Sequence, residues 1–162
     1  MNSLLSKRCS LAKEGILFPA EEFIIEWIFL MELLEEKDMN QKEFESVIKQ
    51  PPNIRYEYFI KKVVAYEEVW GLYDDGWATA QDDDGNMLIP FFPKKEFAEN
   101  CSVCEWSNFK AEPIELDEFI NEFLIPMKED RVKPSIFPTD NDTAVVEIDV
   151  ILRDLNNELE NY

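Results

Sequence analysis

The 162-residue sequence contains no histidine. Histidine is the usual general base near neutral pH, the usual partner of a serine or cysteine nucleophile, and the commonest transition-metal ligand. Only four glycines occur, and no glycine-rich phosphate loop can be found among them. We therefore expect a non-enzymatic protein that holds no metal and no cofactor.

Cysteine is also scarce, since the chain contains only Cys9, Cys101 and Cys104. An odd number with one short spacing does not resemble a secreted disulfide framework, and it favours a reducing, cytoplasmic location. The lone CxxC at residues 101–104 lacks the four ligands of a structural zinc site. It also falls at the end of a predicted helix, whereas a redox CxxC opens one. We expect ordinary, partly buried cysteines.

Long apolar runs are missing as well. The longest, FIIEWIFLMELL at residues 23–34, is broken by Glu26 and Glu32. About 20 apolar residues are needed to cross a bilayer, and a signal peptide has a basic flank that this run lacks. We expect a buried helix here; if it is exposed instead, it is a natural contact for a homodimer.

Positive charge is sparse. The 35 acidic and 16 basic residues give a net charge of −19, and no basic residue occurs between Lys62 and Lys94. Such a surface repels nucleic acid and anionic membranes and favours a basic protein partner. A charged face that only keeps the protein soluble is the alternative interpretation.

Apolar residues at helical spacing predict helices, and short β-branched and aromatic runs between turn signals predict strands. The predicted helices cover residues 21–37, 39–50, 54–68, 94–101, 117–124 and 149–160. The predicted strands cover residues 69–73, 77–81, 87–92, 113–116, 135–138 and 144–147. We expect Asn53 and Asp117 to cap the helices that follow them, and Pro126 to end a helix. The inward side chains of the last helix are predicted to be Val150, Leu152, Leu155 and Leu159.

These elements predict an α+β fold, with a largely antiparallel sheet of about five short strands covered by helices. Residues 1–38 form an N-terminal extension with one apolar helix. Residues 39–162 form a single α+β domain, long enough to bury a hydrophobic core.

A calcium-binding loop is one possible interpretation of residues 69–86, VWGLYDDGWATAQDDDGN. An EF-hand requires acidic or Asn side chains five, three and one residues before its glycine and a glutamate six residues after it. Around Gly85 two of these four positions are wrong, because they hold Ala80 and Phe91. We therefore interpret the stretch as two tight turns between strands, since Asp, Asn and Gly tolerate positive φ.

Three further stretches accompany this block: RYEYFIKKVVAYEE, IPFFPKKEFAENC and IELDEFINEFL. Together with the C-terminal IFPTDNDTAVVEIDVILRDLNNELENY, they resemble a small bacterial family catalogued as a domain of unknown function, numbered 2750. The resemblance covers roughly residues 40–162 and implies an α+β fold. It implies no activity, substrate or catalytic residue.

The functional hypothesis rests on the surplus of acidic side chains. We expect a non-enzymatic interaction protein, in particular an acidic immunity protein or inhibitor that neutralises a basic toxin such as a nuclease. The alternative is a regulatory domain that binds a small molecule or metal in a pocket between sheet and helices. The predicted partner-binding residues are Glu67, Glu68, Tyr73, Asp74, Asp75, Trp77, Asp82, Asp83 and Asp84.

Overall fold

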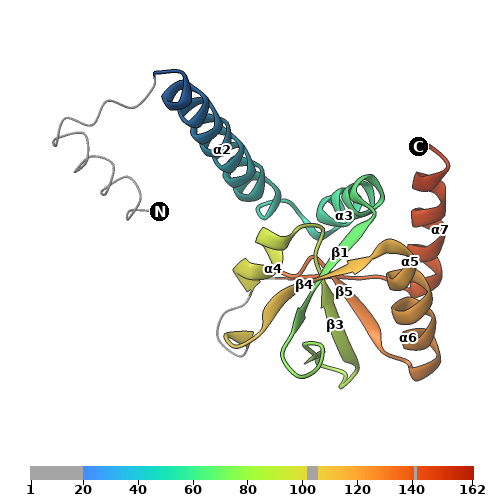
Figure 1. The fold of residues 1–162 in the computed structure, drawn as a ribbon. Coiled ribbons are helices and arrows are strands. Elements are labelled where there is room, and N and C mark those ends of the chain that lie inside the picture. The colour runs from blue at the N-terminus through green and yellow to red at the C-terminus, as the bar shows by residue number, and fades with distance from the viewer. Residues whose placement is uncertain (1–19, 102–105, 141) are drawn as a thin grey trace. The chain divides into compact units, whose positions relative to one another are not determined.

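A computed structural model of the protein describes residues 20–101, 106–140 and 142–162. Cys9 and Cys104 lie outside the described residues. The chain divides into two units between Glu43 and Phe44, and each is described by itself. Helix α2 (Ala20–Val47) continues through this division (Figure 1). The expected break between two helices near residue 39 is therefore wrong, because no glycine or proline interrupts the helix before Pro51.

The expectation that residues 23–34 are buried is also wrong. Eight large apolar side chains of this stretch are exposed, with Ile25 at 69 % and Trp27 at 61 %. Apolar residues occur on nearly every face of the helix, so no single face could bury them all. None of the described helices is both long and apolar enough to cross a membrane. The exposed side chains are Ile24, Ile25, Trp27, Ile28, Phe29, Met31, Leu33 and Leu34.

The second unit contains two sheets. Strands β1 (Glu68–Tyr73) and β4 (Lys110–Glu115) pair antiparallel. Strands β2 (Ala80–Gln81), β3 (Met87–Phe91), β5 (Lys133–Ile136) and β6 (Ala144–Val145) form the other sheet in the order β2-β3-β5-β6. Trp70 and Phe92 join the sheets through two backbone hydrogen bonds of 2.9 and 2.8 Å.

The α+β class with largely antiparallel pairing is confirmed, although two details differ. Strands β3 and β5 are parallel, and the chain between them contains helix α4 (Lys95–Cys101), β4 and the helices that follow. The predicted strand at 77–81 shortens to β2, and Trp77 makes only an isolated bridge to Tyr73. β1 therefore pairs mainly with the distant β4. Pro113 of β4 lies opposite Trp70, whose backbone N–H and carbonyl both bond Phe92 instead.

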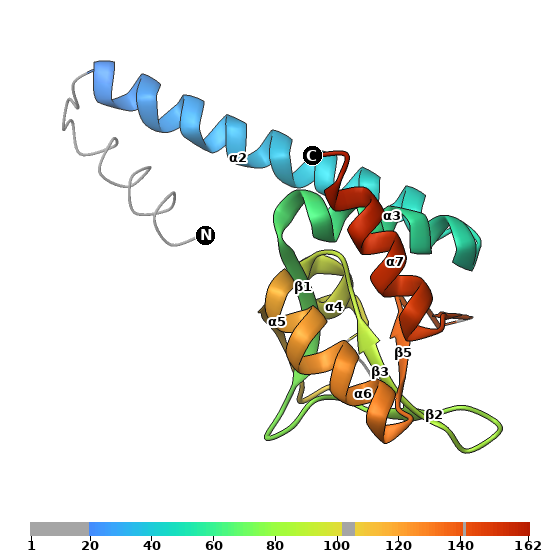
Figure 2. The same cartoon turned by 90° about the vertical axis from the view of Figure 1, so that its right-hand side faces the viewer.

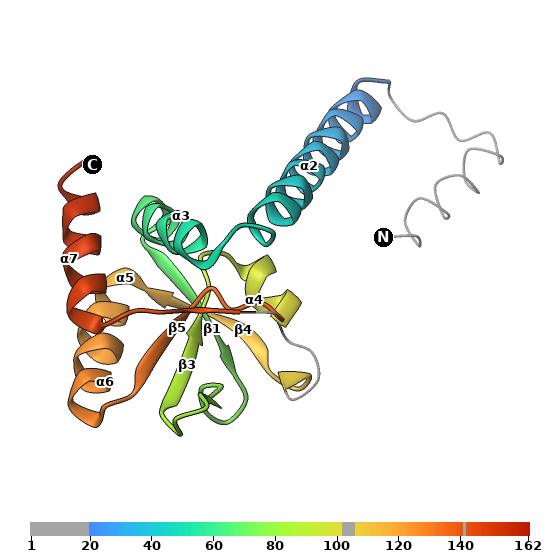
Figure 3. The same ribbon diagram turned by 180° about the vertical axis from the view of Figure 1, so that it is seen from behind.

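The helices of the second unit surround these strands. Their bounds are α3 (Pro52–Tyr66), α4 (Lys95–Cys101), α5 (Leu116–Glu118), the π-helical η2 (Phe119–Leu124), α6 (Ile125–Asp130) and α7 (Ile148–Leu159). Figures 1 and 3 show the strands fanning out beneath α3, with α4 on one side and α6 and α7 on the other. α3 and α7 pack together.

Local signals placed these helices correctly but misjudged their ends. The N-cap positions are Pro51 and Glu115, neither of which makes a side-chain cap, so Asn53 and Asp117 lie in first turns. Pro126 does not end its helix. The Ile125 N–H bonds Ile120 O across a π-helical turn, and Pro126 then occupies the first turn of α6, where no N–H is needed.

One core fills the second unit. α7 contributes Ile148, Ile151 and Leu155, whereas the predicted Leu159 is 39 % exposed. Phe91 and Phe119 meet edge to face at 4.8 Å near the centre. Both rings are fully buried, so they fix the position of β3 against η2.

Candidate functional site

The first acidic turn follows β1. The Asp74 N–H donates to Gly76 O at 3.0 Å, and Asp75 has a φ of 56°. Aspartate tolerates this left-handed conformation better than most residues, so the turn accounts for Asp75 on conformational grounds. Both carboxylates are exposed, and Tyr73 beside them is 42 % exposed.

Trp77 is held by packing rather than offered to solvent. Its ring meets Phe123 at 5.1 Å and Tyr73 at 5.2 Å, in both cases edge to face. It also lies so close over Gly71 that a Cβ there would be 2.6 Å from Trp77 Cζ3. Trp77 is therefore half-buried rather than exposed as predicted, and of the two aromatic residues flanking the turn Tyr73 is the more accessible.

The second acidic turn connects β2 and β3. Asp82 Oδ1 accepts hydrogen bonds from the Asp84 and Asn86 N–H groups, and Oδ2 accepts from Asn86 Nδ2 at 2.7 Å. The bond from the Asn86 side chain is the main cause that lowers the pKa of Asp82. Asp82 thus builds the turn, while Asp83 and Asp84 are exposed.

The exposed carboxylates of both turns lack basic partners. In the described ranges no lysine or arginine forms a salt bridge with Asp74, Asp75, Asp83 or Asp84. Within the same ranges no three Cys, Asp or Glu side chains are grouped so that they could hold a metal ion. The negative charge is therefore left to solvent or to a partner.

The nine predicted residues do not form one cluster. Glu67 caps the C-terminal end of α3. Glu68 begins β1, about 17 Å from Tyr73 by strand rise, and accepts a hydrogen bond from Trp70 Nε1. Figure 2 shows the turn after β1 and the β2–β3 loop at the same end of the second unit, on opposite sides. The structure thus brings together Tyr73, Asp74, Asp75 and Trp77, and separately Asp82, Asp83 and Asp84.

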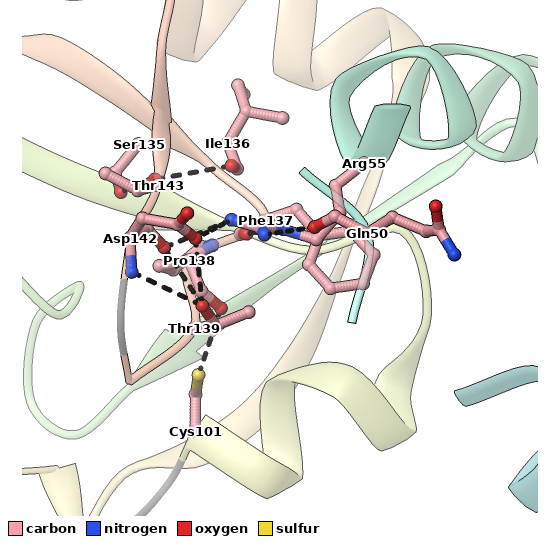
Figure 4. A network of polar contacts seen from close by, with 10 residues as sticks. All are labelled: Gln50, Arg55, Cys101, Ser135, Ile136, Phe137, Pro138, Thr139, Asp142 and Thr143. Atoms are coloured by element: carbon pink, nitrogen blue, oxygen red, sulfur yellow. Dashed lines mark hydrogen bonds and ion pairs between the residues drawn. The ribbon is translucent and has the colours of Figure 1, made fainter. Parts of the chain in front are cut away.

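A polar network that the sequence analysis missed surrounds Arg55, whose side chain is only 2 % exposed. Its Nε donates to Phe137 O at 3.2 Å and its Nη1 to Gln50 O at 2.7 Å (Figure 4). Its Nη2 donates to the backbone and side-chain oxygens of Asp142 at 3.1 and 2.5 Å. A signal for this burial was present, because Arg55 lies one helical turn before Phe59 on the apolar stripe of α3.

The Arg55 network forms one wall of a pocket of about 480 Å³. Phe137 stands beside it with a φ of 48°, a left-handed conformation that is costly for an aromatic residue. The Arg55 bond to Phe137 O and a 2.8 Å bond from the Phe137 N–H to Phe91 O hold it there. The pocket is lined by Phe44, Ile48, Lys49, Gln50, Pro51, Arg55, Phe97, Asn100, Cys101, Phe137, Pro138, Thr139, Asp140 and Asp142.

Cys101 lies at the C-terminal end of α4, as the sequence predicted, and is half-buried. Its thiol donates to Pro138 O at 3.4 Å. Burial, with a smaller contribution from the Asp140 carboxylate, raises the pKa of Cys101 to about 11. The thiol therefore stays protonated near neutral pH and is a poor nucleophile.

Comparison with known proteins places this arrangement in a family without supplying an activity. None of the curated proteins matches the chain. Residues 56–159, well over half of the chain, match the family described as "Protein of unknown function (DUF2750)". The match includes both acidic turns and most of the pocket, and it begins one residue after Arg55. The chain belongs to the DUF2750 family.

Proposed function

We propose that the protein is a non-enzymatic acidic interaction protein that docks onto a basic partner through the turn at Tyr73–Asp75 and the loop at Asp83–Asp84. The observation that supports this most is that these carboxylates are exposed and have no basic partner in the described residues. Only Asp75 and Asp82 are explained by the geometry of their turns. Surplus charge of one sign steers an oppositely charged partner.

The specific form of this proposal is an immunity protein or inhibitor of a basic toxin such as a nuclease. A nuclease presents lysine and arginine side chains where the phosphates of its substrate lie. The aspartates of the two turns would occupy those positions and block access by occlusion. Tyr73 would add a rigid aromatic contact beside the charges.

The test measures association with a basic partner isolated from the native host and identified. Asp74→Lys plus Asp75→Lys should slow association at low salt by about tenfold or more, with a smaller effect at high salt. The matched control is Glu129→Lys plus Asp130→Lys, which makes the same charge change at exposed positions at the end of α6. Equal slowing by both pairs of substitutions would mean that net charge alone causes the effect. No slowing by either pair would overturn the proposed docking surface.

A homodimer through α2 is the second proposal, and the eight exposed apolar side chains of residues 24–34 support it. Burial of such side chains against a second copy is worth roughly 25 cal/mol per Å². Ile25→Glu plus Ile28→Glu should convert a dimer to a monomer in light scattering after size-exclusion chromatography. A wild-type chain that is monomeric at all concentrations would overturn this proposal.

A further inference from the structure

The pocket beside Arg55 combines an apolar wall with charged groups, which is the usual composition of a small-molecule site. The ring of Phe97 stacks on Phe44 with centroids 5.0 Å apart and meets Phe137 at 4.5 Å. Ile48 lies beside these rings in the same lining. This wall suits a large apolar side chain or a ring, and a volume of about 480 Å³ is sufficient for one.

The guanidinium of Arg55 leaves one donor unused. A guanidinium has five N–H groups, and the four acceptors of Arg55 are Gln50 O, Phe137 O, Asp142 O and Asp142 Oδ1. The remaining N–H is on Nη1 and has no acceptor in the described part of the chain. Arg55 lines the pocket and the Nη1 bond to Gln50 O is only partly buried, so this second N–H of Nη1 can serve an acceptor on a ligand.

Two further charged residues in the described lining of the pocket have opposite signs. Arg55 is matched by Asp142, whereas Lys49 and Asp140 form no salt bridge with any described residue. Both are exposed residues of the described lining, which thus offers a ligand one cation and one anion without a salt-bridge partner. The influence of the Asp140 carboxylate on the Cys101 thiol is consistent with its negative potential reaching into the pocket.

We propose that this pocket binds a free α-amino acid with a large apolar side chain. The side chain would lie against Phe97 and Phe137. The carboxylate would accept the unused Arg55 N–H and face Lys49, and the ammonium would pair with Asp140. Only a ligand that carries both charges on one apolar body complements all of these groups. This site is separate from the acidic turns and does not depend on the proposed docking function.

The experiment titrates the full-length protein with L-phenylalanine and follows amide chemical shifts by NMR. Phenethylamine lacks the carboxylate and 3-phenylpropionate lacks the ammonium, so they serve as matched probes. We expect saturable shifts at pocket residues with L-phenylalanine, and binding at least about tenfold weaker for each probe, because each loses one charged hydrogen bond. No saturable shift with L-phenylalanine up to about 10 mM would overturn the proposal.

Variants separate the pocket from binding elsewhere. Asp140→Asn should weaken L-phenylalanine about tenfold and leave 3-phenylpropionate unchanged, whereas Asp130→Asn, outside the pocket, should change neither. Asn100→Trp, at an exposed position on the pocket lining, should abolish binding of all three compounds while the amide spectrum stays dispersed. Unchanged L-phenylalanine affinity in Asp140→Asn or in Asn100→Trp would overturn the proposal.

Discussion

The guanidinium of Arg55 and the carboxylate of Asp142, 87 residues apart in the chain, lie 2.5 Å apart. The pair is asymmetric, because Arg55 is 2 % exposed and Asp142 is 45 % exposed. Arg55 also donates to the carbonyls of Gln50 and Phe137. One side chain thereby ties the segment before α3 to the segment between β5 and β6.

Replacing Arg55 should destabilise the fold strongly. Arg55→Met keeps the length of the side chain but leaves the Gln50 and Phe137 carbonyls without their donor. We expect the free energy of unfolding to fall by about 2–4 kcal/mol, because each carbonyl left without its donor costs about 1–3 kcal/mol, whereas the exposed Asp142 carboxylate is left to solvent. Urea denaturation with an unchanged m-value would measure this loss.

The matched control is the ion pair between Lys128 and Asp149, which has the same 2.5 Å separation. Its side chains are 55 % and 70 % exposed, so solvent screens the interaction. Asp149→Asn should cost at most about 1 kcal/mol. If Asp149→Asn and Arg55→Met destabilised equally, burial would not be the reason for the importance of Arg55.

The buried network around Arg55 joins distant segments, and features of this kind were not predicted from the sequence. Turn residues and periodicity correctly predicted β1, β3 and α4, because these depend on local conformational preferences. The pairing of β1 with β4 and the parallel pairing of β3 with β5 join distant segments, about which local patterns are silent. Whether an apolar helix is buried depends on the segments that pack against it, so composition alone led to the wrong expectation for residues 23–34.

The candidate site likewise has one part that local sequence patterns predict and one part that they do not. The two acidic turns were predicted because Asp-Gly pairs have a conformational signature. A pocket between sheet and helices was only the alternative hypothesis, and its residues were not predicted, since its walls come from the end of α2 and the residues after it, from α3, from α4 and from the segment after β5, and only the tertiary fold joins them. The position of Arg55 four residues before Phe59 was the one local clue, and a charged residue on an apolar stripe is a signal for a buried polar network.

Gly71 should be intolerant of any side chain. A Cβ at this position would lie 2.6 Å from Trp77 Cζ3 and 2.9 Å from Cε3. The indole cannot move freely because it packs against Phe123 and Tyr73. Gly71→Ala should therefore lower the free energy of unfolding by about 1–3 kcal/mol and alter the tryptophan emission.

Gly76→Ala provides the comparison, because a Cβ there meets no atom within 4 Å. We expect its thermal midpoint to stay close to that of the wild type, with a change in stability within about 0.5 kcal/mol. Equal losses for the two glycine variants would mean that contact with Trp77 does not restrict residue 71.

Cys101 should react slowly with alkylating agents. Its pKa of about 11 lies well above the usual value for a thiol, mainly because the side chain is buried. In a Cys9→Ser, Cys104→Ser background, alkylation by iodoacetamide at pH 8 should be roughly 100-fold slower than for the unfolded chain, since the thiolate fraction falls in proportion. Adding Asp140→Asn should speed the reaction, because Asp140 is the smaller cause of the shift; an unchanged rate would exclude that contribution.

Tyr56 should make stability fall at alkaline pH. Its hydroxyl donates to Asp154 Oδ2 at 2.8 Å, and burial together with this bond raises the pKa of Tyr56 far above its ordinary value of 10.0. Below pH 10 the phenol is protonated in both the folded and the unfolded chain. Above pH 10 the unfolded chain releases this proton while the folded chain retains it, so rising pH favours unfolding. The contribution to the slope is at most about 1.4 kcal/mol per pH unit.

The measurement compares urea denaturation of the wild type and Tyr56→Phe between pH 8 and pH 11. The difference in stability between the two proteins should be constant up to about pH 10 and should then shrink, because the phenylalanine has no proton to release. Asp154→Asn should show an intermediate dependence, since the hydrogen bond to the carboxylate is only the second cause of the shift. A difference that stays constant through pH 11 would show that Tyr56 ionises equally in both states.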